Sequence, residues 1–430
     1  MSIEMTITLI VLVVTFLIKM PISLGMIISS IIWLMMKGMD ISIAPEIMTS
    51  RIFNNFTLLA VPLFTLSANL MNSGKVTEKI FNFSMGLVGR WRGALAHVNI
   101  IGSLIFAGTS GSAIADAAGL GVMEIEAMKN EGYEVPFAAA TTASSAVIGP
   151  IFPPSIPLVI YAVIAGVSVG DLFLAGMVPG IFLAVALMIY VAFIARKRNY
   201  PKSKIFTIKE FGINFIKAVP ALLTPVVLFI GIYTGIMTAT EAAAVAALYA
   251  LIVAALIYRT LSLKAILKAI KDTAKTTGQI GIMLAAAFML SYVISVERLP
   301  QLAGNLILKY ASTPAMFLFI CNIILFILGM MVDSAVLQLV LLPILVPIAQ
   351  QLGINMVHFG IVFTLNTMIG LCTPPYGMLL FVVTGISKQP MKAIIKELMP
   401  QIGVMIIVLV IITYIPDTIM WVPRMFGFGG

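Results

Sequence analysis

Two segments of this chain break a long apolar run with a Pro-Pro pair, and the breaks lie 221 positions apart. Each has a glycine followed four and five residues later by the prolines: Gly149, Pro153 and Pro154 in the first break, and Gly370, Pro374 and Pro375 in the second. Proline lacks a backbone donor and clashes with the preceding turn, so each pair leaves carbonyl oxygens without helical partners. In a membrane those carbonyls must be satisfied by protein, water or an ion. A matched pair of broken helices is typical of a transporter's central binding site.

The same spacing recurs at other residues that interrupt helices. Six pairs share the offset of 221: Gly108/Gly329, Gly132/Gly353, Gly149/Gly370, Pro153/Pro374, Pro154/Pro375 and Pro179/Pro400. Isolated matches are expected in a chain with 33 Gly and 22 Pro, but six at one offset without a gap indicate an internal duplication. We therefore expect a first repeat at 1–200, a linker at 201–217 and a second repeat at 218–430.

Composition predicts a helical membrane protein. Hydrophobic residues make up 61% of the chain and charged residues 10%, whereas soluble domains are about half apolar and a quarter charged. The apolar runs are long and continuous, unlike the short alternating strands of a membrane barrel. The expected spans are about 3–18, 22–36, 57–72, 137–165 and 172–195 in the first half, and about 218–236, 240–258, 279–296, 357–386 and 398–415 in the second.

Two further apolar stretches, 93–128 and 314–349, are too long for one span each. Each has a polar interruption near its middle, at 108–112 and at 329–334. We predict two re-entrant helical hairpins whose tips stop at membrane depth. Non-helical backbone is tolerated there only when it is buried in protein or lines a water-filled cavity.

The distribution of basic residues predicts the orientation in the membrane. With the N-terminus outside, five of the 26 Lys and Arg residues fall in outside loops and the other 21 fall inside. The five outside residues are Lys37, Arg51, Arg298, Lys309 and Arg424. This bias follows the positive-inside rule, and it accounts for the net charge of +9 without a nucleic-acid partner. Because five spans per half is an odd number, the second repeat is expected to be inverted.

The hairpin tips carry the polar groups with the greatest functional interest. Ser110, Ser112 and Asp116 lie at or just after the first tip, and Asp333 and Ser334 lie in the second. Carboxylates inside a membrane are costly and indicate function, while hydroxyls and carbonyls suit sodium and carboxylate ligands. The alternatives are a contact between small helix residues for the serines and a structural role for the acids.

Other polar residues indicate no enzymatic site. Glu241 follows Thr238 by three residues and is best explained as an acid at a helix start. His97 and His358 each stand without metal-ligand spacing. The sequence contains no Walker P-loop or HExxH motif, and we expect neither catalysis nor ATP hydrolysis by this chain.

Five motifs together resemble the large membrane subunit of tripartite ATP-independent periplasmic (TRAP) transporters, in the family's order and across nearly the whole chain. They lie at 108–116, 148–155, 231–235, 240–244 and 370–375. Ala239 is one departure, where the family often has proline. The resemblance implies an all-α polytopic membrane protein of the ion transporter superfamily type, with two inverted repeats, about ten transmembrane helices, two re-entrant hairpins and an elevator motion.

The resemblance also implies a sodium-coupled, binding-protein-dependent importer of organic acids such as sialate or C4-dicarboxylates. Its partners are a small four-helix membrane subunit and a periplasmic substrate-binding protein, in the inner membrane of a bacterium or archaeon. The alternative is a self-sufficient sodium/dicarboxylate symporter of the same helical plan. The two differ in their dependence on a binding protein.

Carried over by motif, the resemblance implies particular site residues and two Na⁺ sites, one per repeat. The substrate-binding residues are expected to be Ser110, Ser112, Asp116, Ser155 and Ser334. The sodium ligands are expected to be Ser110, Ser112, Gly149, Pro150, Asp333, Gly370, Thr373 and Pro374.

Overall fold

The computed structural model describes residues 2–18, 20–74, 76–203, 206–302, 304 and 313–427, and every regular element within them is a helix. A short 3₁₀ turn at Phe56–Leu59 precedes α4. The helices of the first half are α1 (Ile3–Leu17), α2 (Ile22–Met36), α3 (Ile43–Phe53), α4 (Ala60–Ser73), α5 (Val76–Val88), α6 (Ala94–Ser110), α7 (Ala113–Asn130), α8 (Val135–Ala146), α9 (Ile156–Ala165) and α10 (Val169–Lys197).

The second half follows a similar plan. Its helices are α11 (Ile208–Tyr233), α12 (Ala239–Ile252), α13 (Leu263–Val296), α15 (Pro314–Gly329), α16 (Ser334–Gln351), α17 (Met356–Leu371), α18 (Met378–Ser387), α19 (Met391–Tyr414) and α20 (Asp417–Met425). Seven helices of the described residues are long and apolar enough to cross a membrane. The all-helical membrane fold is therefore confirmed, whereas the number of crossings stays a prediction.

The helix bounds keep the 221-residue spacing. Helices α7 and α16 begin at 113 and 334 and end at 130 and 351, and α8 and α17 begin at 135 and 356. Both overlong apolar stretches fold as two helices joined by a tight turn, α6–α7 and α15–α16. Both predicted breaks fall between helices, at α8–α9 and at α17–α18. Their re-entrant and inverted placement in a membrane stays a prediction, and Lys309 lies outside the described residues.

Local signals explain where several helices begin. Thr238 and Glu241 form a capping box at the start of α12, which confirms the interpretation of Glu241 as a helix-start acid. A second capping box, Thr207 with Glu210, starts α11 inside the segment predicted as a linker. Helix α13 begins at Leu263, well before the span predicted at about 279, because its first half is amphipathic and hydropathy alone misses it.

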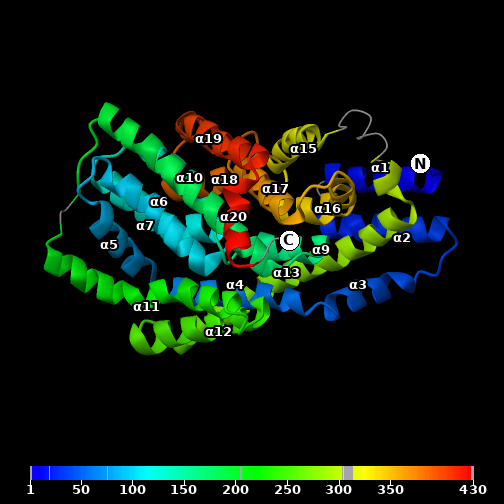
Figure 1. Ribbon diagram of the computed structural model, residues 1–430, viewed down its shortest axis with the longest axis horizontal. Coiled ribbons are helices and arrows are strands. Elements are labelled where there is room, and N and C mark those ends of the chain that lie inside the picture. Colours follow the sequence, from blue (N-terminus) through cyan, green and yellow to red (C-terminus); the bar gives the residue numbers. More distant parts are fainter. Residues whose placement is uncertain are drawn as a thin grey trace.

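The helices pack into a continuous core around the two hairpins. Figure 1 shows α6, α7 and α10 beside α17, α18 and α19, while α1, α2 and α3 lie toward one end. The hairpin of each half packs on the broken helix of the other, α7 against α18 and α16 against α9. Helix α13 runs along this body and contacts α2, α3, α4 and α16. This interlocking brings the two tips to one region of the molecule.

Candidate functional site

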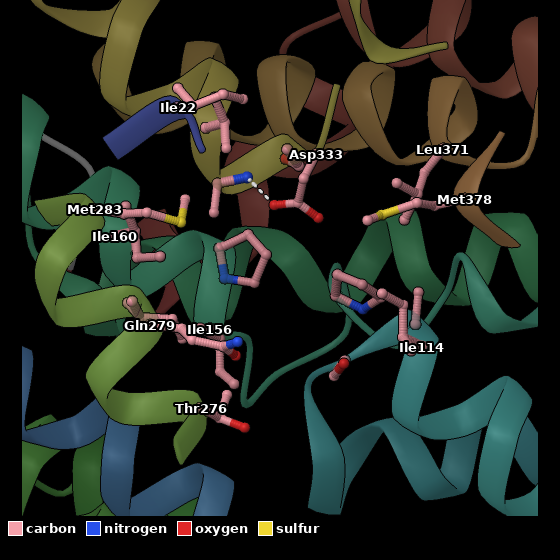
Figure 2. Close-up of a pocket in the computed structure, with 18 of the residues that line it drawn as sticks. Ile22, Ile114, Ile156, Ile160, Thr276, Gln279, Met283, Asp333, Leu371 and Met378 are labelled. Atoms are coloured by element: carbon pink, nitrogen blue, oxygen red, sulfur yellow. Dashed lines mark hydrogen bonds between the residues drawn. The ribbon is translucent and has the colours of Figure 1, made fainter. Parts of the chain in front are cut away.

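A cavity of about 540 Å³ lies where the two hairpin tips meet α2 and α13. Figure 2 shows Asp333 at the second tip, with Thr276 and Gln279 on the wall formed by α13. The first tip contributes Ser112, and the first break contributes Pro150. Among the described residues that line the cavity, Asp333 is the only acid, and there is no Lys, Arg or His. The cavity therefore combines oxygen-bearing groups with one acid that no basic side chain of the described lining accompanies.

The first tip is a turn of two residues, Gly111 and Ser112, between α6 and α7. Ser112 is the N-cap of α7, and its hydroxyl accepts a hydrogen bond from Ala115 N at 3.4 Å. Gly111 has φ of +59° and packs so closely that a Cβ there would lie 2.4 Å from the carbonyl oxygen of Pro154. Only glycine meets both conditions, so this contact fixes the first tip against the first break.

The second tip places Asp333 at the start of α16. Its carboxylate accepts a hydrogen bond from Ala335 N at 2.9 Å, which makes it the N-cap of that helix. Ser334 is buried, and its hydroxyl is 2.7 Å from that of Thr367 on α17. Asp333 thus faces the cavity, while Ser334 ties the tip to the helix behind it.

The second break also touches its own hairpin through backbone. Gly370 meets Gly329 so closely that a Cβ on Gly370 would lie 2.6 Å from the Gly329 carbonyl carbon. Gly377 N donates a hydrogen bond to Met330 O at 3.0 Å. The peptide bonds Pro153–Pro154 and Pro374–Pro375 are both cis. Each tip is therefore held by the break of its own half.

Several predicted site residues lie behind the cavity and do not line it. Ser110 and Thr373 are buried, and Thr373 Oγ1 donates to Ile369 O at 2.7 Å. The Ser155 hydroxyl donates to the carbonyl of Pro150 and accepts from Leu158 N at 3.2 Å as the N-cap of α9. The predicted residues absent from the described lining are Ser110, Asp116, Gly149, Ser155, Gly370, Thr373 and Pro374. Those on the lining are Ser112, Pro150, Asp333 and Ser334.

Asp116 lies one turn into α7 and is almost fully buried, with 1% of its surface exposed. Neither of its carboxylate oxygens accepts a hydrogen bond within the described part of the chain. Ser103 is close by, but its hydroxyl donates to Ser145 Oγ at 3.1 Å. Glu124, two turns further along α7, is likewise buried with an unpartnered oxygen. Asp116 and Glu124 thus lie inside the protein and not at the cavity surface.

The wall formed by α13 is the part of the site that the sequence did not predict. Thr276, Gln279 and Met283 recur every three or four residues, which places them on one side of the helix. Thr276 and Gln279 lie where the lysine-rich first half of α13 gives way to its apolar second half, and this change was the available signal. Its meaning depends on the tertiary contact with the tips, which lie far away in the sequence.

Hairpin tips that meet broken helices around a cavity, in a body of long apolar helices, define a membrane transport protein. Comparison with known proteins identifies the family. The family model described as "Tripartite ATP-independent periplasmic transporter, DctM component" matches residues 9–418. The chain belongs to this family of large permease subunits of TRAP transporters, as the motifs in its sequence indicated.

Two relatives illustrate the range of the family. The sialic acid TRAP transporter large permease protein SiaM of Vibrio cholerae is 41% identical over 412 residues, which cover 95% of this chain and 96% of the relative. The C4-dicarboxylate TRAP transporter large permease protein DctM of Pseudomonas aeruginosa is 34% identical over 373 residues, covering 87% of each chain.

A solved structure supports the fold alone. The YdaH transporter of Alcanivorax borkumensis aligns with a TM-score of 0.63 over 89% of this chain and 88% of its own, at 12% sequence identity. The arrangement of helices is thus shared with a transporter of very different sequence.

Proposed function

We propose that this chain is the large transmembrane subunit of a sodium-coupled, binding-protein-dependent importer of organic acids in a bacterial inner membrane. The observation that carries the proposal is the cavity between the tips. It holds the acid Asp333 and several hydroxyls, and no basic side chain among its described lining residues. A carboxylate cargo would be repelled there unless a cation offset the charge of Asp333.

Two sodium sites are proposed, one at each tip. At the first tip the proposed hydroxyl and carbonyl ligands come from Ser110, Ser112, Gly149 and Pro150. At the second, Asp333, Gly370, Thr373 and Pro374 supply one carboxylate together with hydroxyl and carbonyl oxygens. Both sets lie where a tip meets a broken helix, and the close Gly329–Gly370 contact keeps the second set compact. Such oxygen-rich turns suit small hard cations.

The cargo is proposed to be an organic acid held between the two tips. Ser112 and Ser334 lie nearest the cavity, while Ser110, Asp116 and Ser155 support the tips from behind. Backbone amides at the helix starts that follow Ser112 and Asp333 offer partial positive charge to a carboxylate. The names of SiaM and DctM support an acid such as sialate or a C4-dicarboxylate.

The transport step is proposed to be an elevator motion of the two hairpins and broken helices past α1, α2 and α13. Two inverted repeats of this kind present the same site alternately to each side of the membrane. The subunit is proposed to act with a small four-helix membrane subunit and a periplasmic binding protein that delivers the acid. Membership of the DctM component family supports this three-part organisation.

Reconstitution in liposomes tests the proposal. The chain and its two co-expressed partners are incorporated, an inward sodium gradient is imposed, and uptake of radiolabelled sialate and succinate is followed without ATP. We expect uptake of one acid that requires both sodium and the binding protein. Uptake at the same rate in potassium buffer would contradict sodium coupling. Equal uptake without the binding protein would establish the alternative, a self-sufficient sodium/dicarboxylate symporter.

A further inference from the structure

The first half of α13 is a surface helix attached to the protein by one face only. Ala269 and Thr273 are buried against α4 and its neighbours, and Asn69 Nδ2 donates to Thr273 Oγ1 at 2.9 Å. This contact fixes how the helix is rotated. The opposite face, over residues 263–275, contains the exposed side chains.

Part of that exposed face is apolar. Leu263, Leu267 and Ile270 follow one another at intervals of four and three residues, so they form a single stripe. Their exposed fractions are 74%, 60% and 49%. Such exposure would be unfavourable in water because apolar surface is costly to hydrate. The stripe therefore requires an apolar neighbour.

A second stripe consists of lysines. Lys264, Lys268 and Lys271 each follow an apolar position by one residue, about 100° around the helix, and Lys275 continues the same stripe four residues beyond Lys271. All four are exposed, and none forms an ion pair with another described residue. Asp272 is the single acid within this segment. The exposed face is thus half apolar and half strongly basic.

We propose that this face of α13 binds anionic phospholipid. The phosphates would contact the four lysines, while Leu263, Leu267 and Ile270 enter the boundary between headgroups and acyl chains. An apolar stripe flanked by lysines is the pattern of a helix that lies in the membrane interface, and long lysine side chains reach the headgroups readily. Clustered basic residues beside a membrane helix attract anionic lipid by charge complementarity.

The same helix connects this surface to the cavity. Thr276 and Gln279 lie within about one turn of Lys275 and form part of the cavity wall. Lipid bound along residues 263–275 would therefore hold that wall at the membrane surface while the hairpins move. This role is independent of which acid the cavity takes and of sodium coupling.

Native mass spectrometry in detergent tests the proposal with the full chain. The protein is titrated with dioleoyl phosphatidylglycerol or dioleoyl phosphatidylcholine, and bound lipids are counted. We expect tighter binding of phosphatidylglycerol, and about tenfold weaker binding of it after combined substitution of Lys264, Lys268, Lys271 and Lys275 by Gln. Substitution of all four by Arg should preserve the preference, because Arg retains the charge.

A charge-matched control separates this site from general attraction. Lys197, Lys388, Lys392 and Lys396 are also exposed and lie on the side predicted to be cytoplasmic. Replacing these four by Gln should change phosphatidylglycerol binding less than about twofold if α13 carries the site. Equal losses in both variants, or equal binding of the two lipids by the unaltered chain, would overturn the proposal. Size-exclusion profiles confirm that each variant is folded.

The competing occupant is the small membrane subunit. Leu267→Cys is introduced in a cysteine-free background, and the rate of its labelling by maleimide is measured in lipid nanodiscs. This rate reports which neighbour covers the exposed face of α13. Labelling that is unaffected by the co-expressed small subunit but slowed by phosphatidylglycerol supports lipid binding. Protection by the small subunit in phosphatidylcholine alone would show that a protein occupies the face and would overturn the proposal.

Discussion

The two hairpin tips share a backbone plan but differ in where they place negative charge. Ser112 and Asp333 occupy matched positions, 221 apart, and each is the N-cap of the second helix of its hairpin. In the first half the acid is Asp116, which is buried one helical turn after Ser112. The matched position in the second half is Leu337. The matched positions of the two predicted repeats thus agree in helix caps and breaks but differ in where the acid lies. The two proposed sodium sites are therefore expected to be unequal.

The tips also differ in which glycine makes the close contact between tip and break. At the first tip the close contact is made by Gly111, whereas a Cβ on Gly149 would meet its nearest atom, Ala146 O, at a less severe 3.3 Å. At the second tip a Cβ on Gly370 would lie 2.6 Å from the backbone of Gly329. The second site is thus the more acidic of the two, and the glycine of its break is more closely packed than the matched glycine of the first break. An acid beside a closely packed break suits a small cation. We therefore expect substitutions at the second tip to change sodium binding more than substitutions at the first tip.

The largest effect is expected from Asp333→Asn. The substitution keeps the shape and an oxygen that accepts from Ala335 N, but it removes the charge that a sodium ion would offset. Charged hydrogen-bond partners contribute about 1.5–3 kcal/mol, so the sodium half-saturation concentration should rise about 10- to 100-fold and uptake should fall accordingly. Uptake at varied sodium concentrations in liposomes measures this. An unchanged half-saturation concentration would make Asp333 structural and would remove the proposed difference between the tips.

Gly370→Ala tests the close packing of Gly370 against Gly329 of the second hairpin. The added Cβ meets backbone atoms of Gly329, which cannot rotate away, so we expect destabilisation of about 1–3 kcal/mol. Gly149→Ala is the matched change in the first unit and should cost less. Gly403→Ala in α19, where nothing lies within 4 Å of the added atom, is the control and should be neutral or slightly stabilising. Thermal unfolding in detergent ranks the three, and equal melting temperatures for Gly370→Ala and Gly149→Ala would refute the packing difference.

Much of the site's backbone could be predicted because its signals are local. Proline pairs end helices, and Ser112, Asp333 and Ser155 start them, wherever the chain is placed. The orientation of side chains could not be predicted in the same way. Thr373, expected as a sodium ligand, directs its hydroxyl to Ile369 O and does not line the cavity among the described residues. Whether its carbonyl or hydroxyl binds an ion stays a prediction.

Tertiary contacts explain what the sequence left out. Thr276 and Gln279 lie far from either tip in the sequence. They belong to the site only because α13 packs against α2 and α16. Helices α3 and α5 were not predicted as elements because they are short and their apolar residues are interspersed with polar ones. Hydropathy identifies continuous apolar helices and misses those that are stabilised mainly by packing.

Ser112→Ala should have a smaller effect than Asp333→Asn. It removes an N-cap, which costs about 1 kcal/mol, and one hydroxyl from the proposed first sodium site. We expect the sodium half-saturation concentration to rise severalfold, with the cooperativity of sodium dependence reduced because one of two sites is weakened. The same liposome assay measures both quantities. A loss as severe as that of Asp333→Asn would show that charge at the tip does not distinguish the two sites.

The smallest effect is expected at the far end of α13, where Glu297 lies just beyond the helix and outside both tips. Partial burial alone would raise the pKa of Glu297, but hydrogen bonds from Ser2 Oγ at 2.6 Å, from Lys37 Nζ at 3.0 Å and from Trp33 Nε1 at 3.0 Å lower it below the ordinary value of 4.5. A depressed carboxyl pKa contributes stability above the unfolded-state pKa, and that stability is lost as pH falls through the lower folded-state pKa.

Glu297→Gln should therefore lower the melting temperature modestly near neutral pH and reduce its decline in acid, because the variant has no carboxyl group to protonate. Its sodium half-saturation concentration should match that of the unaltered chain, since Glu297 joins α13 to α1 and α2 and does not line the cavity among the described residues. Melting curves across acidic pH and sodium-dependent uptake test the two statements separately. A changed sodium dependence would mean that charge outside the tips also affects sodium binding. The difference between Ser112 and Asp333 alone would then not explain the sodium dependence of uptake.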